Sequence, residues 1–147
     1  MKDEGADFNS VDYNARSALH IACINGHLNV VKFLLKESKI VISFIFTNNI
    51  GVFLDKIDSS GSSPLYHSIK KGHNDIAILL YFKGASVHAP KEKLAKMLCL
   101  CGMRGDVEKV KLLNECESDL EISDYDLRTV AHIAAAEGHF DLLYYLI

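Results

Sequence analysis

Histidine is the residue type in this chain that most invites a metal-binding hypothesis, and its spacing argues against one. Five of the seven histidines recur at corresponding places in a repeated pattern: His20, His132, His27, His73 and His139. A metal site needs ligands that converge on one point, whereas this pattern supplies them repeat by repeat. His67 and His88 stand alone in the sequence. We therefore expect structural roles for the five recurring histidines and no bound metal.

The cysteines offer little support for a zinc or disulfide site. Cys99 and Cys101 are too close in sequence for a usual zinc knuckle, and the other two, Cys23 and Cys116, form no second pair. Free cysteine is commonly buried as a small apolar group, and nothing in the sequence indicates an oxidising compartment. We expect free thiols packed in the core of a cytoplasmic protein that needs no cofactor.

Acid–base chemistry is similarly unsupported. The closest carboxylate pair, Asp124 and Asp126, falls on an expected hairpin tip, where exposure would leave the pKa values of both groups unsuited to such work. The chain contains no GxxxxGK[ST], GxSxG or HExxH motif. We expect no enzymatic activity from this chain.

Charge and hydropathy exclude two further classes of partner. The formal net charge is −3, and no cluster of lysine and arginine is dense enough to track a phosphate backbone, so nucleic acid is not expected. The longest apolar run, residues 40–46, is far shorter than the roughly 20 residues of a membrane helix. The acidic start of the chain also lacks the basic-then-apolar order of a secretory signal.

The chain repeats itself with a fixed period. Gly-His occurs at Gly26, Gly72 and Gly138, and the midpoint between the last two is Gly105, which is followed by Asp106. The step from Gly72 to Gly105, and from Gly105 to Gly138, is therefore one period. An aspartate stands at the same distance before three of these glycines, as Asp12 does before Gly26. Four copies share one frame, the third being the most divergent.

The residue pattern of each copy predicts two short helices. Ser17, Ser63 and Thr129 are suited to cap a first helix, Pro64 suits its first position, and the glycine of each copy suits its end. A second helix follows, and its apolar spacing gives a stripe that can meet the next copy. These stripe residues are Leu28, Val30, Val31, Leu34 and Leu35, then Ile76, Ala77, Leu79 and Leu80, and finally Phe140, Leu142, Leu143 and Leu146. A single helix pair cannot bury such a stripe, so the copies must stack.

These residues resemble the ankyrin-repeat family, whose signature T-P-L-H-x-A and repeat period they approach over almost the whole chain. The resemblance implies an all-α solenoid of stacked helix-turn-helix pairs joined by hairpin loops. The repeats would span about residues 8–40, 54–87, 88–120 and 121–147. The residues that match the repeat signature are His20, Gly26, His27, Pro64, Gly72, His73, Gly105, His132, Gly138 and His139.

Two places depart from the pattern. The third copy has Lys96-Met97-Leu98-Cys99 at its signature tetrapeptide, so we expect its helices to persist with an altered first turn and hairpin. The first two copies are farther apart than one period, and residues 41–53 account for the surplus. This segment is either a genuine loop or a translated unspliced segment. With no polar capping repeat at either end, the sequence is also typical of a piece of a longer protein.

The favoured functional hypothesis is a non-catalytic module that binds another protein through its hairpin tips and concave helix face. The resemblance implies the same. The candidate contacts are tip and helix-face residues that the repeat pattern does not require: Tyr13, Asn14, Arg16, Ser60, Tyr66, Tyr125 and Arg128. An alternative for the two arginines is that Arg16 and Arg128 pair with Asp12 and Asp124 within their turns.

Two other hypotheses remain open. The stretch from Pro90 to His139, including Asp124-Tyr125-Asp126 and Ala134-Ala135-Ala136, resembles the ankyrin arrays attached to cytosolic asparaginases and, more loosely, glutaminases. The chain would then be the accessory tail of a larger amidohydrolase, although no catalytic motif of such an enzyme is present. The third hypothesis is an architectural role, in which the array joins domains or assembles with itself.

Overall fold

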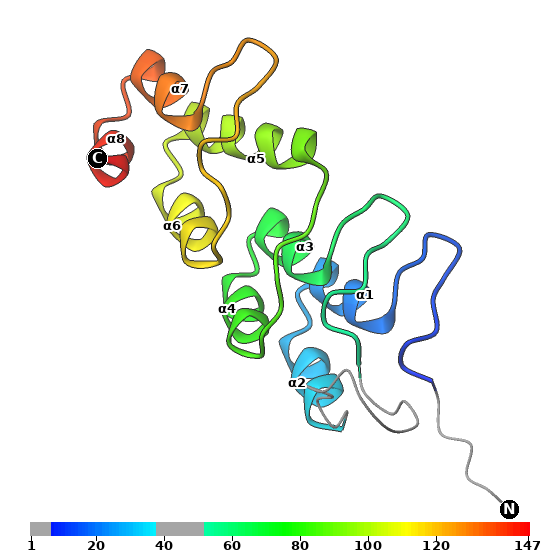
Figure 1. Cartoon of the computed structure of the whole chain (residues 1–147). Coiled ribbons are helices and arrows are strands. Elements are labelled where there is room, and N and C mark those ends of the chain that lie inside the picture. The colour runs from blue at the N-terminus through cyan, green and yellow to red at the C-terminus, as the bar shows by residue number, and fades with distance from the viewer. Residues whose placement is uncertain (1–6, 38–51) are drawn as a thin grey trace, which may run out of the picture. The chain divides into compact units, whose positions relative to one another are not determined.

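Helices arranged in consecutive pairs make up the described part of the chain. The computed structural model describes residues 7–37 and 52–147, and within these ranges it contains eight α-helices and no β-strand. Short glycine-containing steps separate the two helices of each pair, and longer described loops lead into the second, third and fourth pairs (Figure 1). The all-α architecture predicted from the sequence repeat is confirmed.

The first compact unit, Met1–Ser86, contains two helix pairs. The first pair is α1 (Ala18–Asn25) and α2 (Leu28–Glu37), and the second is α3 (Pro64–Lys71) and α4 (Asn74–Phe82). Helix α1 packs against α3, and α2 packs against α4. The core of this unit is formed by fully buried side chains, among them Leu19, Cys23, Val31, Leu65, Ile69, Ala77 and Leu80.

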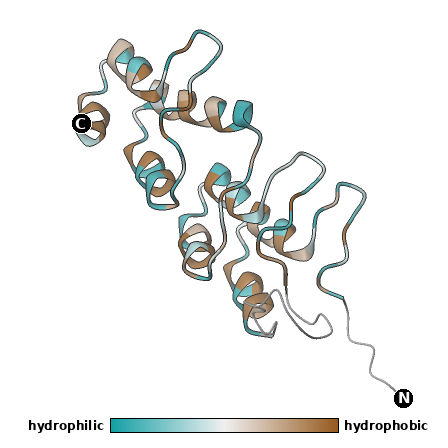
Figure 2. Ribbon diagram, in the orientation of Figure 1, coloured by the Kyte–Doolittle hydropathy of each residue, from teal (hydrophilic) through white to brown (hydrophobic). Residues whose placement is uncertain are grey.

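The second compact unit, Val87–Ile147, repeats this arrangement. Its pairs are α5 (Lys91–Arg104) with α6 (Val107–Glu115), and α7 (Val130–Glu137) with α8 (Phe140–Leu146). Helix α5 packs against α7, and α6 against α8. Apolar residues lie mainly on the helices, where they alternate with hydrophilic ones around each ribbon (Figure 2). The core includes Leu98, Val110, Leu113, Ala134 and Leu142.

The helix boundaries follow the predicted capping residues. Ser63 precedes α3 and accepts a hydrogen bond from the Tyr66 backbone N–H at 3.3 Å, while Pro64 takes the first helical position. Ser17 and Thr129 occupy the same position before α1 and α7. Gly26 and Gly72 end α1 and α3 in the left-handed conformation, with φ of 73° and 81°, which other residues adopt at a cost.

The third helix pair persists in altered form, as the sequence predicted. Helix α5 has 14 residues and begins directly after Pro90, so it runs through the position where α1, α3 and α7 have their N-cap. Lys96 and Met97, at the altered signature, therefore lie within the helix. Asp106 replaces the histidine of Gly-His and caps α6 by accepting a hydrogen bond from the Lys109 backbone N–H at 3.1 Å.

Most of the predicted insertion, residues 41–53, lies outside the described residues. Description resumes just before its end, where the Phe53 backbone N–H donates to Asn9 Oδ1 at 2.9 Å. Lys56 Nζ donates to the Asn9 carbonyl at 2.8 Å. The chain that leads into the second repeat is thus fixed against the start of the first.

Candidate partner-binding surface

Three hairpin tips share one aspartate-centred turn. In the first, Asp12 Oδ1 accepts hydrogen bonds from the backbone N–H groups of Asn14 at 2.8 Å and Arg16 at 2.9 Å. The Asp12 N–H donates to the Arg16 carbonyl at 3.0 Å and so closes the turn. The Asp12 carboxylate and these backbone bonds together hold the tip, because an aspartate side chain can accept hydrogen bonds from backbone N–H groups two and four residues farther along the chain.

The same bonds recur in the other two tips. Asp58 Oδ1 accepts from the backbone N–H groups of Ser60 and Ser62, at 2.8 and 3.1 Å. Asp124 Oδ1 accepts from those of Asp126 and Arg128, both at 2.9 Å. The fourth residue of each turn has a positive φ, which is 56° at Ala15, 73° at Gly61 and 59° at Leu127.

The second residue of each turn points to solvent. Tyr13 is 96% exposed and Tyr125 is 94% exposed, and Ser59 occupies the corresponding place in the second tip. The turn itself is held by aspartate and backbone groups. Within the described residues, no hydrogen bond or ring contact involves either tyrosine side chain, and both lie at hairpin tips.

Asn14 and Ser60, two of the sequence candidates, take part in the turns. The Asn14 carbonyl accepts a hydrogen bond from the Ser59 N–H at 2.8 Å, which joins the first tip to the second. Ser60 Oγ donates to Asp58 Oδ1 at 2.6 Å. Both residues lie on the tips, but each also stabilises the turn.

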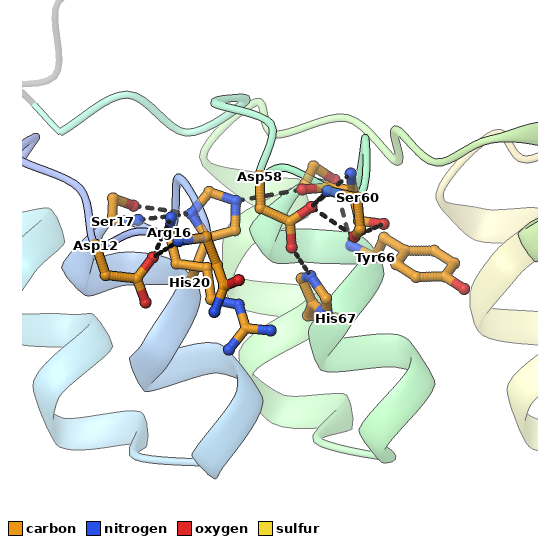
Figure 3. Close-up of polar contacts among 11 residues, drawn as sticks. Asp12, Arg16, Ser17, His20, Asp58, Ser60, Tyr66 and His67 are labelled. Carbon is orange, nitrogen blue, oxygen red and sulfur yellow. Dashed lines mark hydrogen bonds and ion pairs between the residues drawn. The ribbon is translucent and has the colours of Figure 1, made fainter.

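The two arginine candidates behave differently. Arg128 pairs through its Nη2 atom with Asp124 at 2.8 Å and Asp126 at 3.0 Å, so the intra-turn alternative is confirmed there. The Arg128 backbone N–H, with the guanidinium, lowers the pKa of Asp124. Arg16 makes no ion pair with Asp12 in the described part of the chain, and its Nε atom is buried without a hydrogen-bond partner there. Figure 3 shows its guanidinium extending toward His67 instead.

The prediction that Tyr66 is a surface contact is wrong. Tyr66 is 2% exposed. Helix α3 buries Pro64, Leu65, Tyr66, Ser68 and Ile69, which together cover more than half of its circumference, so Tyr66 does not lie on an exposed helix face. The remaining candidates are thus Tyr13, Asn14, Arg16, Ser60, Tyr125 and Arg128.

A buried polar pair beside the second tip was missed by the sequence analysis. His67 Nε2 donates to Asp58 Oδ2 at 2.8 Å (Figure 3), and Asp58 is only 5% exposed. Burial alone would raise the pKa of Asp58, but hydrogen bonds from Ser60, His67 and Ser62 outweigh it and hold that pKa well below its usual range. Burial also lowers the pKa of His67, and its bond to Asp58 offsets this only in part. His67 stands alone in the sequence pattern, but in the structure it is paired with Asp58.

Ser60, Asp58 and His67 are the residue types of a hydrolase triad, but they are connected in a different order. In a triad, histidine lies between serine and aspartate and takes the serine proton. Here Asp58 lies between the other two, and the Ser60 hydroxyl donates to it. This order makes the cluster a support for the hairpin rather than a nucleophile with its base.

His20 joins the first repeat to the second. Its ring is fully buried, Nδ1 accepts from the Ser17 backbone N–H at 3.2 Å, and Nε2 donates to the Ser62 carbonyl at 3.2 Å. Burial lowers the pKa of His20, in keeping with a neutral ring that donates at one nitrogen and accepts at the other. The predicted structural role of this histidine is confirmed.

The histidines after glycine form a second set of links. His73 Nε2 donates to the Ile24 carbonyl at 3.2 Å in the first unit, and His139 Nε2 donates to the Met103 carbonyl at 3.0 Å in the second. Ile24 and Met103 occupy the same repeat position, two residues before glycine. This histidine was expected only to have a structural role, and in each unit its ring bonds a carbonyl in the last turn of a helix of the preceding repeat.

The thiols are free, and most are buried. Cys23, Cys101 and Cys116 are buried, and Cys99 is half-buried. Burial raises the pKa of Cys23 to about 12 and those of Cys101 and Cys116 to about 11.

Over residues 7–37 and 52–147, no group of three or more His, Cys, Asp or Glu side chains is arranged to hold a metal ion. In the same ranges, none of the helices is long and apolar enough to cross a membrane.

Comparison with known families agrees with this repeated geometry. The family model described as ankyrin repeats (three copies) matches residues 1–91. The chain belongs to the ankyrin-repeat family. Ankyrin repeats are non-catalytic protein-interaction modules.

Several much longer proteins contain regions similar to this ankyrin chain. L-asparaginase of Dirofilaria immitis is 29% identical over 147 residues, covering all of this chain and 23% of that protein. The NF-kappa-B p105 subunit of Mus musculus is 26% identical over 136 residues, or 91% of this chain and 13% of that protein. The mitochondrial liver isoform of glutaminase from Rattus norvegicus is 39% identical over 57 residues, or 39% of this chain and 10% of that protein. The chain thus spans less than a quarter of each relative.

Proposed function

We propose that this ankyrin chain captures a partner protein through its hairpin tips, with Tyr13 and Tyr125 as the main contacts. The observation that carries the proposal is their exposure, 96% and 94%, on turns that aspartate holds in place. An exposed aromatic ring on a rigid turn loses little conformational entropy on binding and buries a large area. Tyrosine is accordingly among the residues that dominate binding energy at interfaces.

The other candidates contribute around the tyrosines. Asn14 and Ser60 lie on the tips, next to the second turn position, and their turn bonds limit the entropy lost when a partner docks. The Arg128 side chain is 55% exposed and its guanidinium lies beside two carboxylates, so it adds a polar rim to the third tip. The helix faces that border the tips would extend the contact, as stacked repeats commonly do. The free thiols favour a reducing compartment, and we place the protein in the cytoplasm.

A capture experiment tests this proposal. The chain is immobilised, exposed to cell extract, and compared with the double variant Tyr13→Ser and Tyr125→Ser. Serine is a matched replacement because Ser59 occupies the same place in the second tip. We expect the double variant to lose proteins that the unmodified chain retains.

The control is Phe82→Ser, which removes an aromatic side chain that is 81% exposed at the end of α4, away from the tips. This variant should capture the same proteins as the unmodified chain. Equal losses from both variants would mean that capture depends on exposed aromatic surface in general and would contradict binding at the tips.

A second candidate function is an accessory region of a larger amidohydrolase, with the partner in the same polypeptide. The similarity to L-asparaginase of Dirofilaria immitis over the full chain favours it, and the similarity to glutaminase is in keeping with it. The full-length transcript decides between the two candidates. An amidohydrolase reading frame joined to this one would support the second, and the chain alone should hydrolyse no asparagine in either case.

A further inference from the structure

Arg16 of the first hairpin tip holds a cation where the first two repeats meet. It directly precedes Ser17, the N-cap of α1, and is half-buried. Its Nε atom is buried and has no hydrogen-bond partner in residues 7–37 and 52–147, and no ion pair within these ranges involves its guanidinium. A buried donor that makes no bond costs free energy, so an acceptor brought to this guanidinium would be bound favourably.

The third tip shows what the first tip lacks. Arg128 stands at the same repeat position as the arginine of the first tip, and it pairs with Asp124 at 2.8 Å and Asp126 at 3.0 Å. In the first tip, the counterpart of Asp126 is the neutral Asn14. The counterpart of Asp124 is Asp12, which accepts two turn N–H groups and makes no ion pair within the described ranges. The same arginine is thus neutralised in one tip and open to an anion in the other.

Asp58, the buried carboxylate of the second tip, is already in use. Its Oδ1 atom accepts from the backbone N–H groups of Ser60 and Ser62 at 2.8 and 3.1 Å, and from Ser60 Oγ at 2.6 Å. Its Oδ2 atom accepts from His67 Nε2 at 2.8 Å. Both oxygens are therefore committed to the hairpin and to α3, and this carboxylate does not serve as the counter-ion of the nearby cations.

A second cation, Lys70, lies beside the same histidine. It follows His67 by three residues on α3, so the two side chains share one face of the helix. Lys70 is exposed and makes no ion pair in the part of the chain that the structure describes. Burial lowers the pKa of His67 most, and the positive charges of Lys70 and Arg16 lower it further. Both cations therefore act at this ring, toward which the Arg16 guanidinium extends (Figure 3).

The repeat itself does not call for a cation at the position of Lys70. The other three repeats have Ile24, Met103 and Ala136 there. Two cations that lack a counter-ion repel each other, which costs stability. Their presence side by side at His67 is better explained by a ligand than by the needs of the fold.

We propose that the junction of α1 and α3 binds an acidic side chain, aspartate or glutamate, of the partner protein. Lys70 Nζ and the Arg16 guanidinium hold the carboxylate, and the guanidinium turns outward so that Nε and Nη2 form a fork around its two oxygens. Planar guanidinium groups suit this pairing because two parallel N–H donors match a carboxylate. Tyr13 lies on the same tip, so a partner that packs on its ring also reaches the junction. This inference rests on the proposed function and adds the chemistry of the partner.

NMR titration of the full chain with a capped tetraglutamate peptide tests the inference, with a tetraglutamine peptide as the neutral probe. The acidic peptide should shift the Arg16 Nε–Hε signal and the backbone N–H signals of His67 and Lys70 saturably, and the neutral peptide should not. Arg16→Gln should weaken the peptide affinity by about tenfold or more and Lys70→Gln by about threefold. Circular dichroism checks that both variants fold.

The matched control is Lys83→Gln, which removes the same charge from an exposed lysine at the end of α4. This variant should bind the acidic peptide as the unmodified chain does. An equal loss of affinity in the control would overturn the inference, because it would mean attraction by overall charge. Equal shifts with tetraglutamine, or no saturable shift at Arg16, would also overturn it. A signal that responds only to a tetraphosphoserine peptide would show a phosphate site and contradict the carboxylate assignment.

The failure of this inference can be told from the failure of the proposed function. The peptides carry no aromatic group, so the double variant Tyr13→Ser and Tyr125→Ser should bind tetraglutamate normally. Capture of a protein that depends on the two tyrosines, together with no response to the acidic peptide, would overturn this inference and leave the tip proposal standing. Peptide binding that depends on Arg16, together with capture that ignores the tyrosines, would support the acidic site and overturn the tip proposal.

Discussion

The imidazole of His73 lies directly against Gly26. A Cβ placed on Gly26 would come within 2.6 Å of His73 Cε1, and His73 Nε2 donates to the Ile24 carbonyl at 3.2 Å. The glycine therefore serves two purposes, ending α1 with a φ of 73° and leaving room for a ring from the next repeat. His139 has the same relation to Gly105 in the second unit, with a closest approach of 2.7 Å.

Gly26→Ala should destabilise the first unit more than Gly72→Ala. Both residues end a helix at positive φ, where a Cβ costs about 1–2 kcal/mol. A Cβ on Gly72 would meet nothing within 4 Å, whereas one on Gly26 would also displace His73, adding about 1–3 kcal/mol of overpacking. Urea unfolding measures the difference, and equal losses for the two variants would show that the ring moves aside freely.

Stability should fall as the pH drops from about 7.5 toward 5. Burial lowers the pKa values of His20 and His67 in the folded protein. In the unfolded chain a histidine has a pKa near 6.5, so over this pH range the unfolded chain binds more protons than the folded one, and lower pH favours unfolding. Lys70 and Arg16 add to the lowering at His67. His67→Gln keeps a donor toward Asp58 and should show a smaller fall between these pH values in urea unfolding. An unchanged pH profile would contradict the assignment.

A second loss of stability is expected at acid pH. The folded-state pKa of Asp58 lies below the unfolded value near 3.9, so its contribution is complete above that pH and is lost as the pH falls further. Asp58→Asn should weaken the protein at pH 7 and flatten its pH dependence below about 4. The free energy of unfolding of both proteins between pH 5 and 2 tests this, and parallel curves would count against it.

Leu127→Gly should stabilise the third tip. Leu127 has a φ of 59° and is 79% exposed, so its side chain adds little packing to offset the strain of a left-handed backbone. Glycine relieves about 1–2 kcal/mol of strain and costs about 0.5–1 kcal/mol of extra chain entropy. The reverse exchange at the same turn position, Gly61→Ala, should destabilise the protein. Thermal melting of both variants checks the opposite signs, and a lower melting temperature for Leu127→Gly would contradict the expectation.

Thiol labelling should separate one cysteine from the other three. Burial, with the charge of Asp124, also raises the pKa of Cys99, but that thiol is only half-buried. Cys23, Cys101 and Cys116 are buried, and burial raises their pKa values to about 11 or 12. The thiolate is the reactive form, so iodoacetamide at pH 7.5 should modify Cys99 first and the others only after unfolding. Peptide mass spectrometry reads the order. Early modification of Cys23 would contradict the burial described for α1.

The sequence predicted the helix pairs because their boundaries depend on local chemistry. Ser63, Pro64 and Gly72 act within one or two turns of their own position, so the pattern of residue types suffices. A structural role for His73 could also be anticipated, because its position recurs with the period, although its bond to the Ile24 carbonyl could not. Each of these features repeats, and repetition is what a single sequence reveals.

Tyr66 and His67 were misjudged for the opposite reason. Their residue types occur at these repeat positions in the second repeat alone: Ile21 and Ile133 occupy the place of His67, and His20 and His132 that of Tyr66. Whether such a side chain is buried or finds a partner nine residues away depends on packing, which no periodicity encodes. The length of α5 has the same origin, since it runs through a position where the period predicts a cap.

The most direct test of the central claim measures binding and stability on the same variant. The double variant Tyr13→Ser and Tyr125→Ser is titrated against a captured partner, and its melting temperature is compared with that of the unmodified chain. Loss of the two tyrosines should weaken the affinity for the partner by about tenfold or more, equivalent to about 1.4 kcal/mol or more, and should leave the melting temperature unchanged. Unchanged affinity, or a large fall in melting temperature, would contradict the role of these tyrosines as the partner-binding contacts.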